Sequence, residues 1–370
     1  MPHLATRSLI TAGVVLAGAT GIAAAPAVAP PLEVLAADIQ LTAGEAKDIV
    51  LEFVRHGTST DNVQLINGTV APGAHLTSGP NYPLAYNGEL QAEAVGDKLY
   101  GIYGPNGTDP GIDGIFASGL VRTQETAAPF AGLMGMNVTN LSGLNEINAG
   151  IWEGIQSSSG DAFKNVALSY LAAPMLWTYG LYSVPLLGSS DYNGMAFQDR
   201  FSEAVQQIYD TSMNAEDPTD KDVAFSHGGS IMVWVMMNVK NPDPSLILEH
   251  PLSNTSQVVL EGNPTDGWTL VSWDGIDVAP ADTATQLFVA FRDLMTVPQM
   301  AMFHIEKALL SLDPDQITSA FSTGATDVWN EMVQFPQTVW NILTDTVDPT
   351  PAAGVATDLA GSVGDLAAAI

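Results

Sequence analysis

Histidine and arginine side chains follow three short apolar stretches of this 370-residue chain. Each stretch has the length and the content of β-branched or aromatic residues that are typical of a buried strand. They are Arg55 and His56 at the end of residues 48–56, Arg122 shortly after residues 114–117, and His227 after residues 222–226. Ligands of open α/β sheets bind beyond the carboxyl ends of the strands, so we expect these four side chains at one sheet edge. Guanidinium and imidazole groups that converge there would form an anion site suited to phosphate.

Local backbone features support the same site. Each of the two histidines is followed by a glycine, at Gly57 and at Gly228. Glycine lets the backbone turn sharply and approach a ligand closely. Arg122 falls in the first turn of a helix predicted at residues 121–134, and a helix N-terminus adds positive potential for an anion.

The elements that must position these side chains alternate between strand and helix. Further strands are predicted at residues 257–261 and 268–273, and helices at residues 90–103, 121–134, 195–212 and 230–238. Pro129 should kink or end the helix at 121–134. The alternation favours an α/β fold, and we expect a three-layer αβα sandwich with a mainly parallel sheet.

The chain divides into a main domain and two flanking segments. The main domain is expected at residues 45–280, with an insertion or cap at about residues 155–220. Residues 283–370 read as an α-helical C-terminal extension that ends in a loosely ordered tail rich in Ala and Gly. The apolar faces of its helices must be buried. They could pack back on the main domain, dock to a cell-envelope component, or self-associate.

Composition narrows the range of partners. The chain has 40 Asp and Glu against 11 Lys and Arg, a formal net charge of −29. Nucleic acids and anionic lipid surfaces bind mainly through basic residues, so we expect neither as a partner. The chain has no cysteine, which excludes disulfides, cysteine-ligated zinc and thiol nucleophiles.

Residues 1–37 have the pattern of a signal peptide. Arg7 precedes an uncharged stretch of apolar and small residues, and small residues suited to cleavage follow it. Pro26 and Pro30 argue against a continuing helix, although a retained membrane anchor is the alternative. We therefore expect a secreted protein, extracytoplasmic or in the cell envelope after cleavage. A secreted domain without cysteine is ordinary for bacteria.

Five motifs occur in a fixed order around the candidate residues. They are Arg55-His56-Gly57; Pro83-Leu84 with Asn87-Gly88 and Gln91-Ala92; Ser118 with Arg122 and Thr126-Ala127; Leu144 with Glu146, Gly150 and Trp152-Glu153-Gly154; and Ser226-His227-Gly228-Gly229. Together they resemble the motifs of the histidine phosphatase superfamily, which has the phosphoglycerate mutase-like fold. The resemblance spans roughly residues 48–275.

The resemblance implies a role for each candidate residue. His56 would be the nucleophile that forms a phosphohistidine, and Glu146 would be the general acid and base, with Glu153 or Asp61 as alternative carboxylates. His227 would also be catalytic. The phosphate would be held by Arg55, Asn62, Arg122 and His227. These groups supply the positive charge, so the resemblance implies no metal and no cofactor, and a small phosphorylated substrate.

Two positions depart from the family's mutases. Thr58 stands where cytosolic mutases usually have Glu, and Asn145 where an Arg commonly precedes the catalytic Glu. Both differences remove contacts to a second anionic group, so they favour a phosphatase over a mutase. With the leader and the positive groups of the site, the resemblance implies a secreted, metal-independent phosphatase. The alternatives are a phosphomutase on the same scaffold and a catalytically weak envelope or ligand-binding protein. Retention of the nucleophile and the acid speaks against the last.

Overall fold

The computed structural model describes residues 46–60, 65–66, 69–70, 82–155 and 160–344. The predicted signal peptide at residues 1–37, the Ala- and Gly-rich tail at 350–370, Asn62 and Asp61 lie outside the described residues. None of the helices within the described ranges has the length and apolar character that a membrane crossing requires.

A mixed sheet of seven strands forms the centre of the described chain, in the order β5-β4-β6-β1-β7-β8-β9. The strands are β1 (Ile49–Arg55), β4 (Gly114–Ala117), β5 (Val138–Asn140), β6 (Lys221–Ser226), β7 (Gln257–Asn263), β8 (Gly267–Trp273) and β9 (Ile276–Asp277). The first four in this order are parallel neighbours. Strands β7 to β9 extend the sheet with antiparallel pairing. The expected mainly parallel sheet is therefore mixed, because short turns join β7 to β8 and β8 to β9, and such turns can link only antiparallel neighbours.

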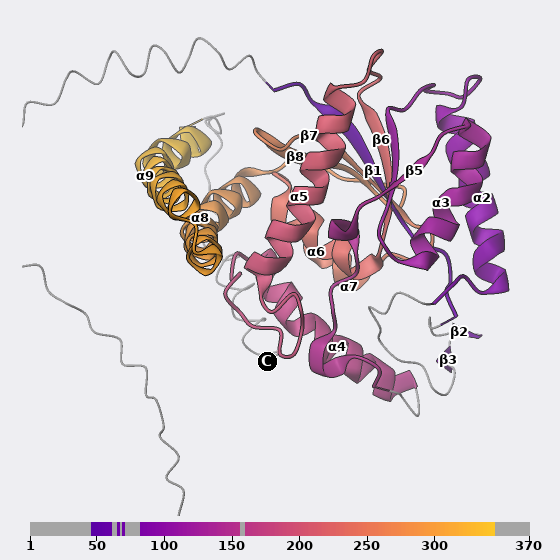
Figure 1. Cartoon of the computed structure of the whole chain (residues 1–370), viewed down its shortest axis with the longest axis horizontal. Coiled ribbons are helices and arrows are strands. Elements are labelled where there is room, and N and C mark those ends of the chain that lie inside the picture. Colours follow the sequence, from indigo (N-terminus) through magenta and orange to yellow (C-terminus); the bar gives the residue numbers. More distant parts are fainter. Residues whose placement is uncertain (1–45, 61–64, 67–68, 71–81, 156–159, 345–370) are drawn as a thin grey trace, which may run out of the picture. The chain divides into compact units, whose positions relative to one another are not determined.

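Helices cover both faces of the sheet (Figure 1). On one face lie α2 (Tyr86–Tyr103) and α3 (Val121–Met134), and on the other lie α5 (Gly194–Met213) and α6 (Gly228–Asn238). Two consecutive residues of β1 point to opposite faces of the sheet. Val54 packs with α2 and α3, whereas Phe53 packs with α5 and α6. This is the expected three-layer arrangement, with a hydrophobic core on each side of the sheet.

Helix α3 has the predicted bounds and continues past Pro129, where the sequence suggested that it would kink or end. It continues to Met134 and ends at Gly135, whose φ of 67° is the left-handed conformation that favours glycine. A Cβ at Gly96 of α2 would lie 3.0 Å from the Phe130 nitrogen, so the two helices are in close contact around the proline. This packing holds α3 together where its own hydrogen bonding is interrupted.

The predicted cap region at 155–220 contains two helices with different surroundings. Helix α4 (Gly160–Thr178), which the sequence did not indicate, precedes a loop and then α5. Phe197 and Phe201 of α5 are fully buried in the core of the sandwich. Trp177, near the end of α4, stacks on Phe197 with ring centroids 5.9 Å apart. The remaining short elements are the β2–β3 pair (Leu65–Ile66 and Thr69–Val70), α7 (Ser245–Glu249) and the 3-10 turns Ser142–Leu144 and Gly150–Trp152.

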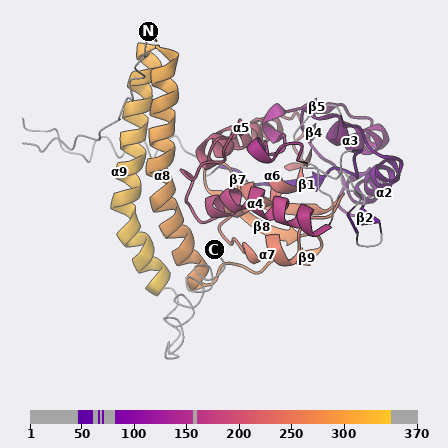
Figure 2. The same ribbon diagram turned by 90° about the horizontal axis from the view of Figure 1, so that it is seen from below.

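Two long helices follow the sheet and form a hairpin (Figure 2). Helix α8 (Thr283–Ser311) is followed by Leu312 in a left-handed conformation and by α9 (Pro314–Thr344). Arg292 of α8 is buried and donates to the carbonyl oxygens of Met236 and Val239 at the C-terminus of α6. A cation at a helix C-terminus is stabilised by the helix dipole. Helix α8 therefore packs back on the main domain, whereas α9 contacts mainly α8.

Candidate active site

Four side chains meet where the adjacent strands β4, β6 and β1 end. Arg55 is the last residue of β1, Arg122 is the second residue of α3, and His227 precedes α6 directly. The rings of His56 and His227 are 5.0 Å apart between centroids, and Arg122 Nε donates to His56 Nε2 over 3.2 Å. Arg122 is 2% exposed, His56 3% and His227 0%. The structure thus brings all four residues to one edge of the sheet, as their positions after strands predict.

One hydrogen bond determines which ring nitrogen of His56 is available for chemistry. Nδ1 lies 2.7 Å from the carbonyl oxygen of Gly57. A carbonyl oxygen can only accept, so Nδ1 carries the proton and donates. The lone pair of the neutral ring is then on Nε2, which faces Arg122.

The loop that carries His56 is held by residues to which the sequence assigned no role. Thr126 Oγ1 accepts from the Gly57 nitrogen at 2.9 Å, and Gln91 Oε1 accepts from the Thr58 nitrogen at 2.8 Å. Asn254 Nδ2 donates to the His56 carbonyl oxygen at 2.9 Å. Gln91 and Thr126 belong to the motifs quoted above, but Asn254 carries no motif and was missed. Together these contacts fix the backbone on both sides of the histidine.

Hydrogen bonds around His227 also define its tautomer. Thr123 Oγ1 donates to the Leu120 carbonyl oxygen at 2.7 Å. The Ser118 hydroxyl can then donate to Thr123 Oγ1 at 2.7 Å and accept from His227 Nε2 at 2.8 Å. In this arrangement, which satisfies every hydroxyl, the proton of neutral His227 is on Nε2. Its Nδ1 is buried and has no hydrogen-bond partner among the described residues.

Arg55 is held from one side only. One terminal nitrogen of its guanidinium donates to the Leu252 carbonyl oxygen. Its Nε is buried without a hydrogen-bond partner among the described residues. A buried donor without a partner is costly, and an anion bound between Arg55 and His227 would supply acceptor oxygens.

Burial and positive neighbours keep both histidines neutral. Burial lowers the pKa of His56 well below its usual 6.5, and Arg122 and Arg55 lower it further. The pKa of His227 is lowered well below the same value by burial first and then by Arg122. A phosphate dianion would offset the arginine charges and favour a proton on Nδ1 of His227. The site therefore combines two guanidinium charges with a neutral imidazole that can act as a nucleophile.

Glu146 lies at the N-terminus of α6, beside the candidate phosphate ligand Arg55. Its Oε1 accepts from the backbone nitrogen of Ser230 at 2.8 Å and from the Ser230 hydroxyl at 3.0 Å. Its Oε2 accepts from the Gly229 nitrogen at 3.3 Å. A Cβ on Gly229 would lie 2.8 Å from Glu146 Oε1, and one on Gly228 would lie 3.1 Å from Arg55 Nε. At two consecutive positions, Gly229 thus makes room for the Glu146 carboxyl group and Gly228 for the Arg55 guanidinium.

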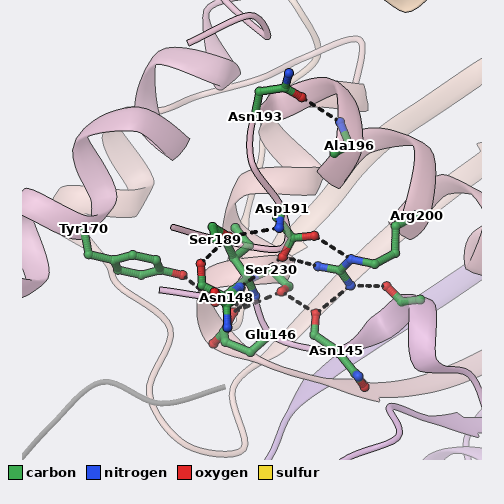
Figure 3. A network of polar contacts seen from close by, with 12 residues as sticks. Asn145, Glu146, Asn148, Tyr170, Ser189, Asp191, Asn193, Ala196, Arg200 and Ser230 are labelled. Carbon is green, nitrogen blue, oxygen red and sulfur yellow. Dashed lines mark hydrogen bonds and ion pairs between the residues drawn. The ribbon is translucent and has the colours of Figure 1, made fainter. Parts of the chain in front are cut away.

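Arg200 of α5 holds the segment that carries Glu146 (Figure 3). Its guanidinium donates to the carbonyl oxygens of Gly143 at 2.7 Å and Asn145 at 2.9 Å. It also binds both carboxylate oxygens of Asp191, at 2.8 and 3.0 Å. Asp191 in turn accepts from the backbone nitrogen of Asn148 at 3.0 Å. Arg200 therefore fixes the backbone before Glu146 directly and the backbone after it through Asp191.

Further contacts complete this network. Ser189 Oγ donates to the Asn148 carbonyl oxygen at 2.6 Å, and the Tyr170 hydroxyl donates to the Ile147 carbonyl oxygen at 3.2 Å (Figure 3). Tyr170 comes from α4, so the cap region also contacts this segment. Sequence reasoning missed Arg200, Asp191 and Tyr170, because none of them lies in a motif and all are distant from Glu146 along the chain.

The other residues singled out in the sequence have different surroundings. The Asn145 side chain accepts from the Gly119 nitrogen at 2.8 Å, next to the start of α3. Thr58 lies in the loop after His56, and its Oγ1 donates to Gln91 Oε1 of α2. Glu153 accepts from the Ala149 nitrogen at 3.2 Å. The predicted phosphate ligand Asn62 and the alternative carboxylate Asp61 lie outside the described residues, so their roles stay predictions.

Comparison with known proteins places the chain in a family. In sequence, residues 51–275 match the model of the histidine phosphatase superfamily (branch 1). The PE-PGRS family protein PE_PGRS11 of Mycobacterium tuberculosis (strain ATCC 25618 / H37Rv) is 44% identical over 313 residues, which are 83% of this chain and 50% of that protein. The chain thus spans only about half the length of this relative.

Solved structures of similar fold include two mycobacterial proteins. Mycobacterial hydrolase 2 is 20% identical with a TM-score of 0.46, over 66% of this chain and 98% of that one. Mycobacterial glucosyl-3-phosphoglycerate phosphatase is 19% identical with a TM-score of 0.45, over 62% and 99% of the two chains. The assignment rests on the family model, which matches more than half of the chain and includes every described residue of the site. The chain belongs to the histidine phosphatase superfamily.

Proposed function

We propose that this protein hydrolyses phosphomonoesters through a phosphohistidine on His56. One observation carries the proposal above all others. His56 Nε2 presents a lone pair beside Arg122, while Nδ1 donates to a carbonyl oxygen and cannot compete for the substrate. A buried nucleophile between two guanidinium groups is suited to in-line attack on a phosphate.

The first step forms the covalent intermediate. The lone pair on His56 Nε2 forms a bond to phosphorus as the bond from phosphorus to the leaving oxygen breaks. The Glu146 carboxyl group gives its proton to that oxygen, so the product leaves as an alcohol and Glu146 becomes a carboxylate. Arg55, Arg122 and protonated His227 stabilise the charge on the phosphoryl oxygens.

The second step releases phosphate. A water molecule attacks phosphorus, and the Glu146 carboxylate takes its proton. The bond from phosphorus to Nε2 breaks, and its electron pair returns to His56. Glu146 and His56 are then in their starting states, so the cycle consumes only ester and water. The positive groups of the chain supply the charge that a metal supplies in many other phosphatases, so we propose a metal-independent reaction.

Activity of the purified chain tests this proposal. We expect inorganic phosphate to be released from an aryl phosphate in the presence of EDTA. His56→Ala should lower turnover by about a thousandfold or more, whereas His304→Ala on α8 should leave it unchanged. Rapid alkaline quenching should trap a phosphoryl group on His56 that is labile to acid. Normal turnover by His56→Ala would overturn the mechanism.

The same assay separates the two rival functions. A phosphomutase would isomerise a phosphorylated substrate with little release of inorganic phosphate. A ligand-binding protein would bind phosphate, detectable by calorimetry, without turnover of any ester. A panel of small sugar phosphates and nucleotides then defines the substrate, which we propose to be a small phosphomonoester.

We also propose that the protein is exported, on the basis of the signal-peptide pattern in residues 1–37. Expression of the full chain in a bacterium that carries out Sec-dependent export tests this. We expect the extracytoplasmic form to begin after one of the small-residue sites near residues 25–37, as read by N-terminal sequencing. A full-length chain confined to the cytoplasm would contradict export.

A further inference from the structure

Helix α9 carries two apolar stripes, of which only one is packed against other residues that the structure describes. The inner stripe packs on α8, with Gly324 against Ala301 and Phe335 against Phe291, whose ring centroids are 5.0 Å apart. One residue further along each turn lies a second set, here called the outer stripe. It consists of Phe321, Trp329, Met332 and Trp340, which are 50%, 67%, 58% and 64% exposed. At about 100° per residue these four side chains fall within roughly 100° of helical arc, so they form one continuous face.

Exposed apolar residues of α8 extend this face. They are Met295, Met302 and Leu309, which are 43%, 67% and 48% exposed. On each helix, the exposed stripe is rotated about the helix axis by about 80–100° from the stripe that packs on the other helix, in the direction of increasing residue number. Because the two helices are antiparallel, these rotations have opposite senses when both helices are viewed from one end. Both exposed stripes therefore point to the same side of the hairpin. The other side holds a cavity of about 330 Å³ lined by Asp293, Glu331 and Lys240, so the polar groups gather there.

The charge of the segment restricts what can cover this face. No Lys, Arg or His follows Lys307 in the sequence. An anionic membrane or a nucleic acid would find no basic residue on α9. The acidic residues of the middle of α9, Asp327 and Glu331, lie on the opposite side of the helix from the outer stripe, by the same count of about 100° per residue. Between Phe321 and Trp340 the outer stripe of α9 is free of charged side chains, which lets two copies of a chain with a net charge of −29 meet along it, while the exposed Glu306 of α8 lies one turn after Met302 at the edge of the extended face.

The outer stripe is also complementary to itself. If two α9 helices cross antiparallel with the two-fold axis between Met332 and Val333, Trp340 of one copy lies over Ala325 of the other. In the same register, Trp329 lies over Pro336. Each tryptophan thus meets a smaller side chain, which favours close packing of two like faces.

The size of the face suits a stable dimer. Helix α9 has 31 residues and is therefore about 46 Å long. In this register residues 321–344 overlap over about 36 Å, and two helices side by side are about 20 Å wide, so the hairpin offers about 700 Å² per copy, near the roughly 800 Å² per partner of a stable interface. We propose that two copies of this chain associate through the hairpin, with the outer stripes of α9 antiparallel about Met332.

Sedimentation velocity of the full chain tests the dimer. We expect a dimer whose dissociation constant rises more than about tenfold in Met332→Asp, because the variant places two carboxylates at the two-fold axis. Leu248→Asp makes a similar change on an exposed residue of α7 and should leave the dimer intact. A monomer at all concentrations, or a dimer insensitive to Met332→Asp, would overturn the proposal. Binding of a monomer to neutral phosphatidylcholine vesicles would do so too, since it would assign the face to lipid.

Cysteine cross-linking tests the register, because the chain has no cysteine of its own. Met332→Cys should form a disulfide between copies under mild oxidation, since the two positions are close to the axis. Ala325→Cys and Trp340→Cys should cross-link to each other when mixed and should not cross-link efficiently alone. Efficient cross-linking of Phe321→Cys to itself would indicate parallel helices and would overturn the antiparallel arrangement. None of these readouts depends on phosphatase activity, so the dimer and the proposed reaction can fail separately.

Discussion

His56 owes its proposed reactivity to groups that surround it rather than to its own type. The Gly57 carbonyl oxygen holds the Nδ1 proton, and burial beside Arg122 and Arg55 lowers the pKa of the ring well below its usual value. A histidine with a lowered pKa stays neutral, and hence nucleophilic, as the pH falls below 6.5. The loop contacts from Gln91, Thr126 and Asn254 then fix where the ring lies. At the residue scale, the proposed chemistry depends on where the His56 ring lies and on which of its nitrogens carries the proton.

The role of Glu146 predicts a dependence on the leaving group. We expect Glu146→Gln to lower turnover of an alkyl phosphate about a hundredfold or more, because the poor leaving oxygen needs a proton. Dinitrophenyl phosphate should be affected much less in the phosphorylation step, because its oxygen leaves without one. Pre-steady-state release of the alcohol measures this step alone. Equal losses for both esters would show that Glu146 is not the acid.

At the scale of the elements, α5 and α6 position the acid from both sides. Helix α6 binds the Glu146 carboxyl group with its N-terminal backbone, while Arg200 of α5 binds the backbone before Glu146 directly and the backbone after it through Asp191. Arg200 and Asp191 touch no proposed substrate atom. Arg200 is therefore a positioning residue, and its effect should pass through Glu146.

A double-mutant cycle tests this positioning. We expect Arg200→Met to lower turnover about tenfold or more for an alkyl phosphate and less for dinitrophenyl phosphate, following the pattern of Glu146→Gln. In the Glu146→Gln background, Arg200→Met should have little further effect on the phosphorylation step, because both changes disable one group. Arg200→Lys should restore part of the loss. Additive losses with no dependence on the leaving group would show a merely structural role.

The contact of α2 with the histidine loop gives a second prediction at this scale. A Cβ at Gly88 would lie 2.0 Å from the Thr58 carbonyl oxygen, so Gly88→Ala must push the loop and the helix apart. We expect a loss of about 1–3 kcal/mol in the free energy of unfolding, together with reduced turnover. Gly101 of the same helix has no atom within 4 Å of such a Cβ, so Gly101→Ala should be neutral or stabilising. Urea denaturation of both variants measures the difference, and similar values for the two would contradict the close contact.

At the scale of the whole molecule, the two ends of the strands have different tasks. The carboxyl ends carry the candidate site, whereas Asp222 is buried near the start of β6. Burial raises its pKa to about 8, and Asp113 and Asp220 add to the rise. The folded chain therefore keeps this carboxyl group protonated, far from the reaction.

This buried acid predicts how stability depends on pH. Between about pH 4 and pH 8 the folded chain holds a proton at Asp222 that the unfolded chain has lost, so stability falls as the pH rises. The slope from this group is at most about 1.4 kcal/mol per pH unit. Asp222→Asn should remove this pH dependence. The free energy of unfolding of the variant should therefore rise relative to that of the parent as the pH increases from 6 to 8. Denaturation curves at both values decide this, and an unchanged pH dependence would contradict it.

Much of this architecture could be predicted from local sequence. The apolar runs that end at Arg55, Ala117 and Ser226 are strands because their residues favour a buried, extended backbone. Parallel neighbours end at the same edge, so the side chains that follow them converge without any knowledge of distant contacts. The candidate residues Arg55, His56, Arg122 and His227 could be named for that reason, whereas Glu146 was implied only by the resemblance of its segment to the histidine phosphatase motifs.

Only the tertiary structure decided the rest, because it depends on contacts between residues far apart in the chain. Helix α3 continues through Pro129 because α2 packs against it, and Arg200 reaches the Glu146 segment from another helix. Likewise, the periodicity of α9 indicates an apolar helix but does not say which of its adjacent stripes meets α8. That choice follows from how the hairpin closes, and it is what leaves Trp329 and Trp340 on the surface. Local propensity specifies elements and the ends of strands, whereas packing between elements selects which faces are buried.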